Sequence, residues 1–61
     1  MYEKYVDLRD ERHLTDYQVA KETGIPQSTF SDWKSGRSKP KVEKLIKIAK
    51  FLGASVEYFY E

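Results

Sequence analysis

The sequence predicts an all-α fold in which five short helices form one domain over residues 1–61. Three observations lead to this fold class. Apolar residues recur at helical spacing, the glycines Gly24, Gly36 and Gly53 interrupt that pattern, and no repeat, linker or low-complexity tract separates the segments. A chain of 61 residues is near the lower size at which a single core suffices, so every helix must contribute apolar surface.

The first helix is expected from about Tyr2 to Arg12. Three- and four-residue spacing directs Tyr5, Leu8 and Arg9 toward the interior. His13 follows the helix, where contacts with the last carbonyls and the helix dipole explain a lone histidine better than metal binding does.

The next two helices are expected to form one unit over about residues 15–35. Thr15 can cap the first of them while Gln18 reaches back to the N–H of the cap residue. Gly24 ends that helix, since glycine tolerates the left-handed conformation, and Pro26 presets φ for a second helix over about Gln27–Ser35.

The second helix of this unit has two distinct faces. At 100° per residue Phe30 and Trp33 point inward. The opposite face is polar and short, and it carries Ser28, Ser31, Asp32 and Ser35, flanked by Gln27. We therefore expect this face to stand clear of the protein.

Two further helices complete the core. The fourth, over about Lys41–Leu52, has lysines on one side and these residues on its buried side: Val42, Leu45, Ile46, Ile48, Ala49 and Leu52. Ser55 can then cap a last turn or two in which Val56 and Phe59 close the core, while Tyr58 and Tyr60 lie outside.

The charge of the chain is unevenly distributed. The net charge is only +1, below what is expected of a nucleic-acid-binding domain. Residues 33–50, however, carry seven Lys or Arg residues and a single acid, Glu43, whereas residues 1–32 carry four cations and seven acids. Phosphates could lie along the basic stretch. The alternative for Lys44, Lys47 and Lys50 is an outer helix face that only keeps the chain soluble.

Several function classes are disfavoured. The chain has no cysteine, one histidine and no paired carboxylates on a common helical face, so we expect no enzymatic activity, no cofactor and no metal. No apolar run approaches the roughly 18 residues of a membrane span, and the charged start does not resemble a signal peptide. We expect a soluble cytoplasmic protein.

Nearly the whole chain resembles the Cro and cI-like phage repressors, the xenobiotic-response-element type of helix-turn-helix protein. The resemblance is carried by Leu14-Thr15, Val19-Ala20, Gly24-Ile25, Gln27-Ser28, Phe30, Trp33, Gly36, Pro40, Leu45, Ile48-Ala49, Leu52-Gly53 and Ser55-Val56. It implies a compact five-helix, lambda-repressor-like domain that binds double-stranded DNA and regulates transcription, with repression favoured. The alternative is a protein-interaction module of the same fold with weak or no DNA affinity.

By this resemblance, the positions that read bases are Gln27, Ser28, Ser31 and Asp32. The amide of Gln27 can pair in a bidentate way with adenine N6 and N7. Ser28 can bond several base edges or a phosphate, or it is a plain solvated serine. Asp32 can accept from a cytosine amino group, filter against other contacts, or be a solvated surface charge.

The phosphate-binding candidates are Thr15, Lys34, Ser35, Arg37, Lys39 and Lys41. Three positions depart from the resemblance, and one of them is His13, which stands where glycine is frequent in the family. Asp16 stands where the family usually has glutamine, and we interpret it as a first-turn acid favoured by the helix dipole. Lys34 replaces the glutamate that commonly pairs with Arg9, so we expect Arg9 to find Asp32 or a carbonyl.

A homodimer on DNA is also expected, because family members bind two-fold related half-sites. Phe51, Tyr58 and Tyr60 could make an apolar patch for a second copy of the chain. The alternative is loose packing of Phe51 on the C-terminal turn.

Overall fold

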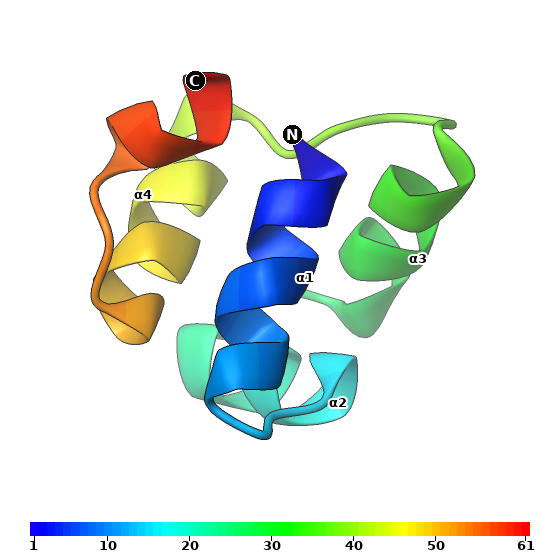
Figure 1. Ribbon diagram of the computed structural model, residues 1–61. Coiled ribbons are helices and arrows are strands. Elements are labelled where there is room, and N and C mark those ends of the chain that lie inside the picture. Colours follow the sequence, from blue (N-terminus) through cyan, green and yellow to red (C-terminus); the bar gives the residue numbers. More distant parts are fainter.

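The chain forms four α-helices and one 3₁₀-helix. A computed structural model describes all 61 residues as α1 (Tyr2–Glu11), α2 (Asp16–Thr23), α3 (Gln27–Ser35), α4 (Val42–Leu52) and η1 (Val56–Tyr60), shown in Figure 1. Each predicted helix is present, and the predicted bounds differ by one residue at the end of α1 and at the start of α4. The fifth helix is a 3₁₀-helix, since its five residues form little more than one turn.

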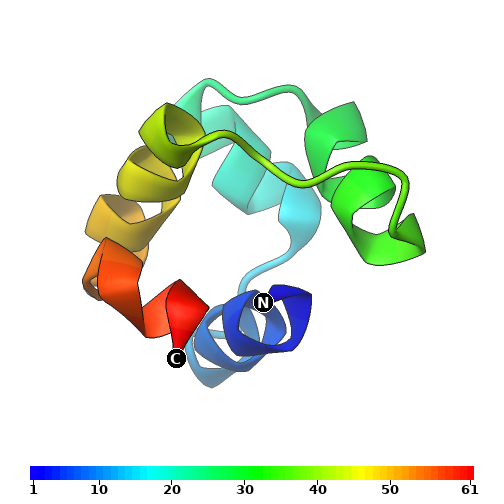
Figure 2. The same cartoon turned by 90° about the horizontal axis from the view of Figure 1, so that it is seen from above.

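The helices enclose one core of 12 buried apolar side chains. Seen from above, α3 and α4 lie on opposite sides of the molecule, and the segment of residues 36–41 crosses between them (Figure 2). Pro40 is buried on this connecting segment. The arrangement leaves the outer side of α3 without a covering element.

An aromatic cluster attaches α3 to α1. The ring of Tyr5 stacks on that of Trp33 at 5.1 Å between centroids and lies 5.2 Å from that of Phe30. Tyr2 and Phe59 meet the indole edge-to-face at 5.5 and 6.2 Å. Aromatic pairs in these geometries stabilise a protein by about 0.5–1.5 kcal/mol each beyond the burial of their area. The apolar face of α3 is thus held firmly.

Local signals set the start of α2 and the turn that follows it. The Thr15 hydroxyl accepts from the Gln18 N–H at 3.2 Å and the Gln18 side chain accepts from the Thr15 N–H at 2.8 Å, which confirms the predicted capping box. Gly24 follows α2 at φ 75°, a value that favours glycine. Ile25 is buried directly after it, so the turn is fixed in the core.

The side of α4 that faces the core is narrower than predicted. Leu45, Ile48 and Leu52 are buried, but Val42 and Ile46 are 51% and 40% exposed, so their predicted burial is wrong. Both lie at the edge of the apolar stripe of α4, and this small domain has no further helix to cover that edge.

Two other sequence predictions need correction. His13 lies in the left-handed region at φ 56°, so its backbone makes the turn after α1, and its side chain makes no hydrogen bond. Ser55 precedes η1 without a capping bond from its side chain.

None of the helices combines the length and the apolar character needed to span a membrane.

Candidate DNA interface

The polar side of α3 is open to solvent. Gln27, Ser28 and Ser31 are exposed, whereas Phe30 and Trp33 on the other side are buried. Side chains on a helix stripe with this exposure can approach the floor of a major groove, which is wide enough to admit an α-helix. The structure therefore presents three of the four predicted base-reading residues together.

Asp32, the fourth predicted base reader, is engaged within the protein. Its carboxylate lies 3.6 Å from the Arg37 guanidinium and is only half exposed. Its backbone carbonyl accepts from the Arg37 N–H at 3.0 Å and from the Ser35 hydroxyl at 3.1 Å. Asp32 therefore joins the end of α3 to the segment that follows and does not pair with Arg9, and its base-reading role stays a prediction.

The basic residues after α3 gather between α3 and α4. Lys39 and Lys41 line a polar hollow that Lys44 also borders, and Thr29 and Asp32 form its α3 side. Lys34 and Ser35 at the end of α3, and Arg37 after it, are also exposed. Lys44 thus groups with the predicted phosphate-binding lysines, although the sequence alone left open whether it only solvates the outer face of α4.

Asp16 has a structural partner set that the sequence did not predict. Its carboxylate accepts from the Tyr5 hydroxyl at 2.6 Å and from the Arg9 guanidinium at 2.9 Å, and Arg9 also pairs with Asp10 at 2.9 Å. The expectation that Arg9 pairs with Asp32 or a carbonyl is wrong, because the short turn between α1 and α2 brings Asp16 within reach of Arg9. Thr15, the phosphate-binding candidate at this helix start, is exposed.

The ionisation of the two α1 side chains reflects this network. Burial raises the pKa of Tyr5 well above its usual range, and the hydrogen bond to the Asp16 carboxylate raises it further. Partial burial lowers the pKa of Arg9, but the hydrogen bonds to Asp16 and Asp10 outweigh it and leave that pKa raised. Tyr5 therefore remains a neutral donor and Arg9 a cation at ordinary pH.

The three residues predicted as a dimer patch occupy different surroundings. Phe51 lines a hollow with Leu14 and Tyr17, at the end of α4 that lies farthest from η1 in Figure 1. Tyr58 is half buried beneath the Lys4 ammonium, which lies 4.8 Å from its ring centroid, so it does not lie outside as predicted. Tyr60 is exposed.

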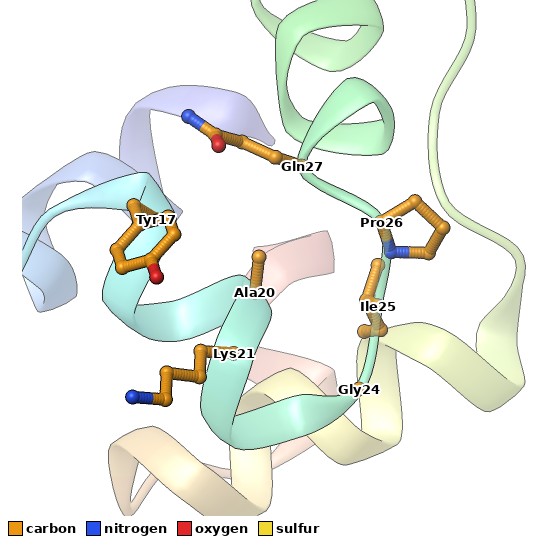
Figure 3. A pocket seen from close by; sticks show the side chains of 7 residues that line it. All are labelled: Tyr17, Ala20, Lys21, Gly24, Ile25, Pro26 and Gln27. Atoms are coloured by element: carbon orange, nitrogen blue, oxygen red, sulfur yellow. The ribbon is translucent and has the colours of Figure 1, made fainter.

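A third hollow, which the sequence did not predict, adjoins the reading face. Figure 3 shows it between α2 and the first residue of α3, lined by Tyr17, Ala20, Lys21, Gly24, Ile25, Pro26 and Gln27. Tyr17 is 61% exposed at the rim. An aromatic residue on the polar side of a short amphipathic helix is the sequence signal that could have drawn attention to it.

Comparisons with known proteins agree with this geometry. Residues 7–59 match the family model described as Helix-turn-helix. The chain is 38% identical over 53 residues to the cryptic phage CTXphi transcriptional repressor RstR of Vibrio cholerae, across 87% of this chain and 48% of RstR. It is 33% identical over 55 residues to the HTH-type transcriptional activator BcrR of Enterococcus faecalis, across 90% of this chain and 27% of BcrR.

The chain therefore spans about half the length of one relative and about a quarter of the other. No solved structure gave a significant match. The family match covers most of the chain, including the paired helices α2 and α3, the glycine turn and the lysine-rich segment. This chain belongs to the helix-turn-helix family, of the Cro and cI-like repressor type.

Proposed function

We propose that this protein is a sequence-specific regulator of transcription that binds double-stranded DNA through α3, and that it acts as a repressor. One observation carries the proposal: α3 exposes Gln27, Ser28 and Ser31 on a side that no other element covers, while buried aromatic rings hold the opposite side. A polar helix face held on a rigid base is suited to insertion into a major groove.

Base contacts and phosphate contacts divide between two sets of residues. Gln27 is the principal base reader, because its amide can donate to N7 and accept from N6 of one adenine. Exposed Lys34, Arg37, Lys39 and Lys41 contact phosphates on either side and fix the register of the helix. Exposed Thr15 and Ser35, each at a helix end, complete the proposed phosphate set; a phosphate contact by the Ser35 hydroxyl would replace its bond to the Asp32 carbonyl.

The direction of regulation is inferred from the two relatives, and the assembly state from the exposed aromatic side chains. The names of both relatives describe transcriptional regulators, and the relative with the higher identity is the repressor. We propose a homodimer on two-fold related half-sites, with Tyr60 and Phe51 as the exposed aromatic candidates for contacts between copies. The protein acts in the cytoplasm, where the DNA is accessible.

Selection of bound duplexes from a random pool tests the proposal. The unmodified chain is expected to enrich one motif, and log Kd for that motif is expected to rise with log salt by about 0.9 for each phosphate contacted. Gln27→Ala is expected to lose discrimination at one adenine, by about 1–3 kcal/mol, while keeping the same salt slope.

Two results would contradict the proposal in different ways. Absence of binding at about 50 mM salt would favour a protein-interaction module of the same fold, because electrostatic binding is strongest at low salt. Binding with an unchanged motif in Gln27→Ala would remove Gln27 from the reading set and leave DNA binding intact.

A further inference from the structure

The hollow beside Gln27 has the chemistry of a methyl-binding site. Its floor is formed by Ala20 and Ile25, which are almost completely buried, and one wall is the exposed ring of Tyr17. Lys21 places a cation on the rim. The apolar surface suits an apolar group, and the cation beside it suits a phosphate close to that group.

The hollow is continuous with the proposed reading face. Gln27 belongs to both, and its side chain extends from the start of α3 toward the α2 side of the hollow in Figure 3. When the amide of Gln27 meets an adenine edge, the hollow therefore opens onto the same groove. The C5-methyl of thymine is the apolar group that base pairs present there.

We propose that Tyr17 is a specificity-determining residue, and that the hollow between Tyr17 and Gln27 takes the C5-methyl group of a thymine next to or paired with the adenine that Gln27 reads. This inference rests on the proposed DNA-binding function. The Tyr17 ring and the side chains of Ala20 and Ile25 cover the methyl group, and Lys21 contacts the neighbouring phosphate.

Deoxyuridine provides the test, because it lacks the methyl group and keeps the hydrogen-bonding edge of thymine. Each thymine of the selected motif is replaced in turn by deoxyuridine, and Kd is measured for the 61-residue chain. One replacement is expected to weaken binding by about twofold to fourfold, the upper value being a fully buried methyl at about 0.8 kcal/mol.

Variants at Tyr17 assign the effect to this residue. Tyr17→Ala is expected to bind thymine and deoxyuridine duplexes equally, and it should fold, since Tyr17 is largely exposed and alanine favours the helix. Tyr17→Phe is the matched control: it keeps the ring, so the preference for thymine should remain. Circular dichroism checks that both variants are helical.

Two results would overturn the inference while leaving the proposed function in place. The first is binding by the unmodified chain that no deoxyuridine replacement weakens. The second concerns the deoxyuridine replacement that weakens binding by the unmodified chain. If it weakens binding by Tyr17→Ala equally, the methyl group does not contact Tyr17. Loss of all DNA binding by the unmodified chain would instead refute the proposed function.

Discussion

At the scale of the residue, Asp16 shows how one carboxylate can serve the fold at a helix start that faces the proposed interface. It accepts from the hydroxyl of Tyr5 and from the guanidinium of Arg9, both on α1. The side chains of Asp16 and Arg9 are largely buried, at 24% and 20% exposed, so solvent screens their ion pair less than it screens a surface pair. The negative charge of Asp16 is also matched within the protein.

Replacement of Asp16 by alanine should destabilise the chain measurably. Asp16→Ala leaves the Tyr5 hydroxyl and one side of Arg9 without a partner, so the free energy of unfolding is expected to fall by about 2–3 kcal/mol. The measurement is urea denaturation followed by circular dichroism.

Asp10→Ala is the matched control for this experiment. Asp10 also pairs with Arg9, but its side chain is 61% exposed, so its loss is expected to cost less than about 1 kcal/mol. Equal losses in the two variants would show that burial at Asp16 does not strengthen the network.

At the scale of the element, each helix end depends on its local sequence, and the turn after α1 departs from the most favourable choice. His13 has φ 56°, a conformation that costs a residue with a Cβ about 1–2 kcal/mol relative to the right-handed region. The His13 N–H donates to the Asp10 carbonyl at 3.0 Å, and the Leu14 N–H donates to the Arg9 carbonyl at 3.1 Å. These bonds hold the strained turn closed.

Replacement of His13 by glycine should therefore stabilise the chain. His13→Gly relieves the left-handed strain, and because glycine adds freedom to the unfolded chain the net gain is expected to be about 0.5–1 kcal/mol. The gain should appear as a higher Tm in a thermal melt. His13→Ala keeps the Cβ and should give no gain; a stabilised alanine variant would place the effect in the imidazole and not in the backbone.

At the scale of the whole molecule, the fold collects separated charges into one basic region. Lys39, Lys41 and Lys44 come from the segment after α3 and from α4, and they border one hollow beside Thr29 on α3, which Asp32 and Glu43 also line. The net charge of +1 still understates the charge of this part of the chain, because residues 33–50 carry seven Lys or Arg residues and a single acid. Electrostatic attraction of DNA depends on this local arrangement.

Two lysines of α4 allow the arrangement to be tested. Lys44 and Lys50 are both exposed and lie about 120° apart around the helix axis, and only Lys44 borders the hollow. Lys44→Gln is expected to reduce the slope of log Kd against log salt by about 0.9, and Lys50→Gln is expected to leave it unchanged. Equal effects of the two substitutions would mean that net charge matters and position does not.

The sequence by itself determined where the helices begin and end and which residues face inward on most of them. Local spacing predicts features that depend only on neighbouring residues. These are the capping box of Thr15 and Gln18, the end of α2 at Gly24, and the inward direction of Phe30 and Trp33. For the same reason the exposed set Gln27, Ser28 and Ser31 could be predicted from the sequence.

Tertiary structure alone decided the contacts between side chains on different helices. Helical periodicity gives the direction of a side chain around its own axis, but not the position of the neighbouring helix. The turn between α1 and α2 placed Asp16 beside Arg9, and the absence of a covering helix left Ile46 exposed. The turn after α2 likewise brought Tyr17 and Gln27 to the same hollow. Which side chains of two helices share a surface depends on how the helices pack against each other, and the spacing within each helix does not give that.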